Sequence, residues 1–228
     1  MKTDFSQYRK NAIQKKLNII GVQPLDLLIV GATGAGKSTT LNTILQKEEA
    51  SVGYGAEPET MDTKSYMIND FFRIWDSPGL GDGVEIDKEH KKKISDLLKE
   101  RYQQNYINYG FVDMVLVLLD ASSRDFGTEY DLINNVILKH ISPDRVLIAV
   151  NKADFGLYGR HWDCISNHPD AVLLRKLEEK VISVKNRINL STGLNVPKPI
   201  YYSAECEYNV TKLLDFIIDN MPVTKRML

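Results

Sequence analysis

Residues 25–38 read LDLLIVGATGAGKS and combine an apolar run with a glycine-rich segment. The first six residues are mostly aliphatic and predict a buried strand. The next eight match the pattern G-x-x-x-x-G-K-[ST], and residues 39–47 have the character of a helix. A strand, a glycine-rich loop and a helix in this order form a nest of backbone N–H groups that binds phosphate at the positive end of the helix.

We therefore predict a phosphate loop at residues 31–39. Lys37 would place a cation beside the β- and γ-phosphates of a nucleotide, and the Ser38 hydroxyl would ligate Mg²⁺. The alternative is an accidental glycine-rich turn, and the flanking strand and helix argue against it. The motif alone does not separate ATP from GTP. The residues predicted to hold the phosphates are Gly31, Ala32, Thr33, Gly34, Ala35, Gly36, Lys37, Ser38 and Thr39.

Outward from this loop, short apolar runs alternate with longer stretches of helical periodicity. The runs at 112–119 and 146–150 are apolar on both faces, which is typical of parallel strands between two helical layers. The alternation predicts an α/β fold with a mostly parallel sheet covered on both faces. Further strands are predicted at 63–68, 71–76 and 200–203, and helices at 88–109, 129–140, 172–188 and 210–220.

Two segments fall outside this alternation. Residues 1–24 carry a rough apolar stripe with basic residues beside it, and we predict an amphipathic helical segment ahead of a main domain at 25–228. This segment either packs on its own domain or docks on a membrane or a partner. Residues 155–170 are rich in turn formers, and we expect a long surface loop there.

Composition excludes several classes of protein. Lys plus Arg total 29 and Asp plus Glu total 30, so the formal net charge is −1, and nucleic acid is an unlikely partner on charge alone. The two cysteines, Cys164 and Cys206, stand in unrelated contexts, which excludes a disulfide framework and a four-cysteine zinc site. No aliphatic run approaches the roughly 20 residues of a membrane helix. These features predict a soluble protein of a reducing compartment, the cytoplasm.

A second motif, Asp76-Ser-Pro-Gly79, ends the predicted strand at 71–76. A carboxylate at this place holds Mg²⁺ through a water, and Gly79 offers an unhindered backbone N–H to a γ-phosphate. A plain turn is the alternative, because this tetrapeptide is also good turn chemistry. A loop hydroxyl would complete the magnesium shell and make its loop a switch, and we favour Thr60 over Thr63.

The third motif is Asn151-Lys-Ala-Asp154, directly after the predicted strand at 146–150. The Asp154 carboxylate accepts two hydrogen bonds from guanine, and adenine offers neither, so such a site discriminates by about 10⁴ or more. Lys152 would lay its aliphatic stem along the base, and Asn151 would tie this loop to the phosphate loop. Ser203-Ala204, after the last strand, would supply a backbone N–H to the guanine carbonyl.

With these motifs in this order, the chain resembles the P-loop GTPases over residues 25–220. The run WDSPGLGDG at 75–83 is most similar to the Era-like branch, which includes TrmE and septins. The resemblance implies a three-layer domain whose six-stranded sheet has one antiparallel edge strand. It also implies cycling between GTP and GDP with Mg²⁺, in which Lys37, Thr60 and Gly79 serve catalysis and Ser38, Thr60 and Asp76 serve the metal.

Two positions depart from related GTPases. Leu80 stands where many signalling GTPases have a glutamine that orients the attacking water, and Gly34 stands where potassium-activated relatives have an asparagine. No arginine occurs between Ser38 and Arg73, so the first switch supplies none in cis. We therefore expect slow intrinsic hydrolysis. Asp82 is a weak candidate for positioning the water, and a turn-capping carboxylate is the alternative.

The sequence leaves several functions open. A GTP-hydrolysing switch with an unidentified effector or activating protein is the first. The others are an interaction module in which the nucleotide is structural, a septin- or dynamin-like GTPase that self-associates with nucleotide, and a P-loop ATPase.

Overall fold

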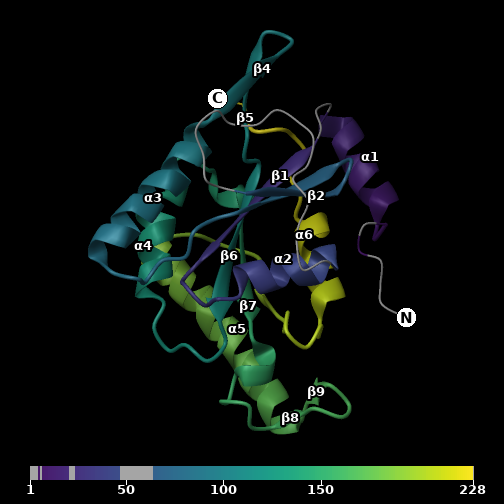
Figure 1. Ribbon diagram of the computed structural model, residues 1–228, viewed down its shortest axis with the longest axis vertical. Coiled ribbons are helices and arrows are strands. Elements are labelled where there is room, and N and C mark those ends of the chain that lie inside the picture. The colour runs from purple at the N-terminus through teal and green to yellow at the C-terminus, as the bar shows by residue number, and fades with distance from the viewer. Residues whose placement is uncertain (1–4, 6, 21–23, 47–63, 228) are drawn as a thin grey trace.

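The computed structural model describes residues 5, 7–20, 24–46 and 64–227. Its centre is a sheet of six strands in the order β10-β7-β6-β1-β3-β2. β2 pairs antiparallel with β3, and the other neighbouring pairs are parallel. The predicted mostly parallel sheet with one antiparallel edge strand is confirmed (Figure 1). The strands are β1 (Leu25–Gly31), β2 (Ser65–Asn69), β3 (Phe72–Asp76), β6 (Met114–Asp120), β7 (Val146–Asn151) and β10 (Ile200–Tyr201).

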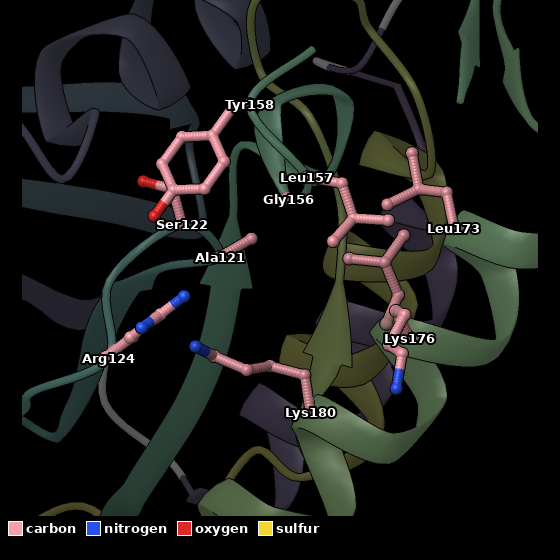
Figure 2. A pocket seen from close by; sticks show the side chains of 10 residues that line it. Ala121, Ser122, Arg124, Gly156, Leu157, Tyr158, Leu173, Lys176 and Lys180 are labelled. Carbon is pink, nitrogen blue, oxygen red and sulfur yellow. The ribbon is translucent and has the colours of Figure 1, made fainter. Parts of the chain in front are cut away.

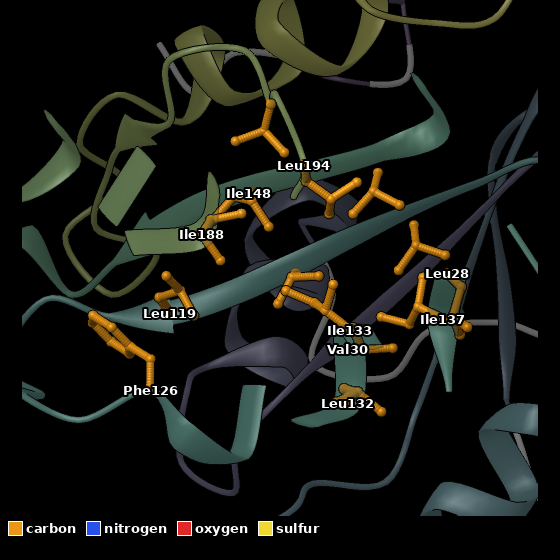
Figure 3. Close-up of a cluster of buried hydrophobic side chains, with 14 of the residues drawn as sticks. Leu28, Val30, Leu119, Phe126, Leu132, Ile133, Ile137, Ile148, Ile188 and Leu194 are labelled. Carbon is orange, nitrogen blue, oxygen red and sulfur yellow. The ribbon is translucent and has the colours of Figure 1, made fainter. Parts of the chain in front are cut away.

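Helices cover both faces of this sheet because the central strands are apolar on both sides. In β1, Leu28 and Val30 face one core with α3, α4 and α5, while Leu27 and Ile29 face the other with α1, α2 and α6. Figure 3 shows the first core, where Phe126, Leu132 and Ile133 gather beside β6. The helices are α1 (Lys10–Ile20), α2 (Lys37–Leu45), α3 (Val84–Lys99), α4 (Gly127–Asn135), α5 (Ala171–Thr192) and α6 (Val210–Asp219).

The helix α1 packs on the same domain through its apolar stripe. Ile13 and Leu17 are buried in the second core, and Arg9 forms ion pairs with Asp215 and Asp219 at 2.8 and 2.7 Å. The helix is therefore anchored to the end of α6. A domain boundary at residue 25 stays a prediction. None of the helices in the described residues is long and apolar enough to cross a membrane.

The predicted helix at 88–109 is wrong in its second half. α3 ends at Lys99, and a hairpin of β4 (Arg101–Gln104) and β5 (Ile107–Gly110) follows and extends away from the central sheet (Figure 1). Asn105 and Tyr106 both take positive φ, 52° and 66°, which makes a tight hairpin turn that a helix cannot accommodate.

Smaller differences occur after α4 and after β7. The predicted helix at 129–140 breaks at Val136 into α4 and the 3₁₀ turn η1 (Ile137–Lys139), and another turn, η2 (Pro143–Arg145), precedes β7. The expected loop at 155–170 contains a small hairpin of β8 (Trp162–Asp163) and β9 (His168–Pro169). The Trp162 and His168 rings stack edge-on against Tyr208, which packs this loop against the segment before α6.

A buried ion cluster fixes the C-terminal segment under the amino ends of β1 and β6. Lys225 Nζ lies 3.2 Å from Asp26 and 2.5 Å from Asp113, and all three side chains are at most 2% exposed. Arg73 pairs with the other oxygen of Asp26 at 2.5 Å. Burial raises the pKa of Asp113, and the Lys225 ammonium opposes that rise. This cluster lies at the end of the sheet opposite to the predicted site.

Candidate functional site

The predicted site residues lie at the carboxyl ends of the parallel strands. β1 runs into the phosphate loop, β3 ends at Asp76 and β7 ends at Asn151. Since parallel strands share one carboxyl edge, the three motifs meet there, as expected for a ligand site in an open α/β sheet. Thr60 and Thr63 lie outside the described residues, so the predicted switch threonine stays a prediction.

Lys37 opens α2 and turns its side chain back over the phosphate loop. Its Nζ donates to the carbonyl oxygens of Gly31 and Ala32 at 3.2 and 3.1 Å. Burial lowers the pKa of Lys37, and the carboxylates of Asp76, Asp82 and Glu129 act in the opposite direction. The ammonium is thus held at the centre of the loop, where an anion would meet it with little rearrangement.

Asn151 joins the third motif to the phosphate loop, as predicted. Its Nδ2 donates to the carbonyl oxygen of Ala35 at 3.0 Å, and its Oδ1 accepts from the backbone N–H of Ala204 at 3.1 Å. Gly36 is required beside it, because φ is +88° and a Cβ would overlap Asn151 Nδ2. One amide therefore holds three loops at fixed positions. The Ala204 N–H donates within the protein, and its role toward a guanine carbonyl stays a prediction.

Asp76 and Ser38 have the chemistry of a magnesium site. Ser38 Oγ donates to Asp76 Oδ2 at 3.3 Å, while Asp76 Oδ1 is buried with no hydrogen-bond partner among the described residues. Burial raises the pKa of Asp76, and the positive charge of Lys37 opposes this. A hard cation would satisfy the orphaned oxygen. The described residues hold no cluster of three His, Cys, Asp or Glu side chains, and Mg²⁺ usually keeps waters and substrate phosphates among its ligands, which would complete the shell here.

A cavity of about 260 Å³ lies beside Gly36 and Thr39 and reaches Asp154. Asp154 lies in the turn η3 (Ala153–Phe155), and its Oδ1 is buried with no partner among the described residues. A buried carboxylate oxygen without a donor is costly unless a ligand supplies one. Guanine carries two such donors on one edge. The cavity is lined by Gly36, Thr39, Asn151, Lys152, Asp154, Phe155 and Glu205.

Asp120 also belongs to the site, and the sequence did not predict its contact with Lys152. It caps the turn after β6 by accepting from the Ser122 N–H at 2.7 Å, and it also accepts from Lys152 Nζ at 2.7 Å. Burial tends to raise the pKa of Asp120, but the hydrogen bonds from Lys152 and Ser122 outweigh burial and lower it. Lys152 has φ of +60°, and this pairing holds its stem along the cavity. The sequence signal that could have indicated this role is the position of Asp120 at the end of β6, the strand next to β7.

Gly79 and Leu80 lie directly against the phosphate loop. A Cβ on Gly79 would stand 2.8 Å from Thr33 Cα, so only glycine fits there. The Leu80 side chain is 1% exposed and packs in the first core, so it faces away from any attacking water. This buried position of Leu80 agrees with the expectation that Leu80 does not orient the attacking water.

Glu129 was not predicted. It is 5% exposed in the first turn of α4, beside the phosphate loop. Burial raises the pKa of Glu129, and backbone groups of Glu129 and Ala32 partly offset the rise. No sequence signal marks it, because the periodicity of α4 resembles that of any helix that packs on a sheet.

A second cavity, of about 170 Å³, adjoins the first through consecutive residues of one loop. Asp154 and Phe155 line the first cavity, and Gly156, Leu157 and Tyr158 line the second. Figure 2 shows the apolar side chains of Leu157 and Leu173 on one side of this cavity and the amino group of Lys180 on another. Lys180 donates to the carbonyl oxygen of Ser123.

The phosphate loop after β1, the acidic residue at the end of β3 and the turn with Asp154 after β7 form the arrangement of a P-loop nucleotide-binding domain. A family model described as "50S ribosome-binding GTPase" matches residues 26–152, more than half of the chain. The chain therefore belongs to this family of GTPases, and the predicted resemblance to P-loop GTPases is confirmed.

Two curated relatives illustrate the similarity. The tRNA modification GTPase MnmE of Chlorobium chlorochromatii is 32% identical over 130 residues, which cover 56% of this chain and 25% of that protein. GTPase Der of Leptospira borgpetersenii is 30% identical over 195 residues, which cover 85% of this chain and 35% of that protein. The chain thus spans between a quarter and about a third of the length of these relatives.

Among solved structures, Toc33 from Arabidopsis thaliana in complex with GDP and Mg²⁺ superposes with a TM-score of 0.61. The alignment covers 98% of this chain and 97% of Toc33 at 14% identity, which establishes a shared fold.

Proposed function

We propose that this chain is a slow guanine-nucleotide switch, which binds GTP and GDP with Mg²⁺ and hydrolyses GTP to GDP and phosphate. The observation that carries the proposal is the buried, unpartnered Oδ1 of Asp154 in a cavity that opens beside the phosphate loop. Asp154 would read the guanine edge, Lys37 would neutralise the phosphates, and Ser38 and Asp76 would hold Mg²⁺. Bound Mg²⁺ supplies charge neutralisation of the terminal phosphates.

The proposal of slow hydrolysis rests on Leu80 and on the first switch. Leu80 is buried, and the sequence has no arginine between Ser38 and Arg73. An arginine is worth about 10³ to 10⁵ in the rate of phosphoryl transfer. We therefore expect a rate at or below roughly 10⁻³ s⁻¹ for the isolated chain, the scale of an unassisted GTPase.

A partner or a second copy of the chain would supply the missing group. Self-association is supported by analogy alone, because the solved structures of Toc33 include a dimerization-deficient mutant. Thr60 stays our choice for the hydroxyl that closes the magnesium shell. Free thiols at Cys164 and Cys206 support a place in the cytoplasm.

Single-turnover phosphate release tests the proposal, with the protein in excess over GTP and Mg²⁺ present. We expect a rate near or below about 10⁻³ s⁻¹ for dilute protein, a higher rate for concentrated protein, and loss of release in Lys37→Met. Lys15→Met, at an exposed position of α1, is the control.

Two outcomes contradict the proposal in different ways. A rate above about 1 s⁻¹ at every concentration would mean that the catalytic group is internal. Tight GTP binding without release at any concentration would favour the second candidate, a module in which the nucleotide is structural, which the burial of Leu80 keeps open.

A further inference from the structure

Thr33, the third residue of the phosphate loop, is bound by the segment that follows Gly79. The Thr33 backbone N–H donates to the carbonyl oxygen of Leu80 at 2.6 Å, and the Thr33 hydroxyl donates to Asp82 Oδ2 at 2.6 Å. Leu80 N–H in turn donates to Gly31 O at 3.4 Å, so the two segments are paired as a short parallel bridge. We call these contacts among Gly31, Thr33, Leu80 and Asp82 the latch.

The latch is itself supported by the start of α3. Asp87 Oδ1 accepts from the backbone N–H groups of Gly81 and Asp82 at 2.7 and 3.2 Å. His90 Nδ1 lies 2.5 Å from the carbonyl oxygen of Gly79, and because a carbonyl only accepts, the ring N–H donates. The position of the latch is therefore coupled to the first two turns of α3.

Both donors of Thr33 thus face acceptors of this chain. A terminal phosphate near the third loop residue would also be an acceptor, and it would be negatively charged like the Asp82 carboxylate. Two acceptors cannot share one N–H at full strength, and two like charges at close range repel each other.

We propose that the latch between Thr33 and Asp82 is a determinant of nucleotide specificity, which favours the diphosphate and must open for the triphosphate. This inference rests on the proposed guanine-nucleotide site. The latch would make the protein distinguish GTP from GDP by a contact that the three motifs do not specify. Thr33 is a variable position of the phosphate-loop pattern, and Asp82 lies beyond the second motif. Opening would release Leu80 and shift the start of α3, where Val84 is 84% exposed and Ile86 47% exposed.

The test compares the dissociation constants of GDP and the non-hydrolysable analogue GMPPNP, with Mg²⁺, in four proteins. They are the wild type, Asp82→Asn, Thr33→Val and the control Glu85→Gln, which removes the same charge from an exposed residue three positions away. We expect both latch variants to raise the affinity for GMPPNP relative to GDP about tenfold, and Glu85→Gln to leave the ratio unchanged. The gain in Asp82→Asn should shrink in high salt because the site is exposed.

Hydrogen exchange of the protein without added nucleotide gives a second readout. The Thr33 and Leu80 amides should exchange faster in Asp82→Asn and Thr33→Val than in Glu85→Gln. An unchanged ratio of affinities in both latch variants, or unchanged exchange at both amides, would overturn the inference while the guanine site stands. Failure of the wild type to bind either nucleotide would overturn the proposed function and this inference with it.

Discussion

Asn151 donates from Nδ2 to the carbonyl oxygen of Ala35 at 3.0 Å, which joins the turn that holds Asp154 to the phosphate loop across 116 residues of sequence. Its Oδ1 accepts from the Ala204 N–H, so a single buried amide sets the distance between the proposed pocket for the phosphates and the proposed pocket for the base. A nucleotide is rigid enough that both pockets must be at the right separation for both to be filled.

The first prediction concerns this amide. Asn151→Ala leaves the Ala35 carbonyl and the Ala204 N–H unsatisfied, at about 1–3 kcal/mol for each buried group. We expect the affinities for GDP and GTP to fall together by about 100-fold, because the loops lose their fixed separation. Isothermal titration calorimetry measures both. Asn186→Ala, on the exposed side of α5, is the matched control, and equal affinities in the two variants would contradict the role of Asn151.

The second prediction concerns the buried ion cluster. Lys225→Met keeps most of the volume but leaves Asp113 without its ammonium partner and Asp26 with the Arg73 guanidinium and the Trp75 indole N–H. Breaking a buried pair in this way costs about 3–5 kcal/mol of unfolding free energy. Urea denaturation at pH 7 measures the loss. Lys212→Met, at an exposed lysine of α6, should change the unfolding free energy by less than about 0.5 kcal/mol; a similar small change in Lys225→Met would show that the cluster contributes little.

The third prediction concerns pH and His140. Burial lowers the pKa of His140, and the cations of Lys99, Arg226 and Lys139 lower it further, while Asp96 acts in the opposite direction. The folded pKa therefore lies below the unfolded value of about 6.5. The contribution of His140 to stability is fully present above the unfolded pKa and is lost as the pH falls through the folded pKa.

We thus expect the wild type to lose stability relative to His140→Asn as the pH drops from 7 to about 5. Urea denaturation of both proteins at a series of pH values gives the difference directly. A constant difference across that range would mean that His140 is as readily protonated in the folded protein as in the unfolded chain.

Much of the fold could be predicted because its signals are local. Aliphatic runs such as 114–120 and 146–151 mark strands buried on both faces, and the glycines around Lys37 mark the turn between β1 and α2. The hairpin at 101–110 was missed because its turn, Asn105-Tyr106, lacks the glycine that usually announces positive φ, and because Leu97, Leu98 and Tyr102 kept a helical spacing across the end of α3.

The sequence predicted the three motifs of the site but not the residues outside the motifs that contact them. The three motifs carry their chemistry in adjacent residues. Asp120 and Glu129 belong to other elements and reach the site through the packing of β6 and α4. The contact of Thr33 with Asp82 depends on how the phosphate loop pairs with the segment after Gly79. The spacing of residues within either segment does not predict this pairing. The sequence suggested that Asp82 positions the attacking water or caps a turn, and its hydroxyl partner in the phosphate loop, Thr33, became apparent in the structure.

Recognition of guanine by Asp154 is tested by an affinity panel of GTP, ATP and xanthosine triphosphate on the wild type and Asp154→Asn. We predict that the wild type prefers GTP over ATP by about 10⁴ or more. In Asp154→Asn the affinity for GTP should collapse and that for xanthosine triphosphate should rise, because an amide donates where the xanthine carbonyl accepts. Equal competition by ATP and GTP for the wild type would contradict the account.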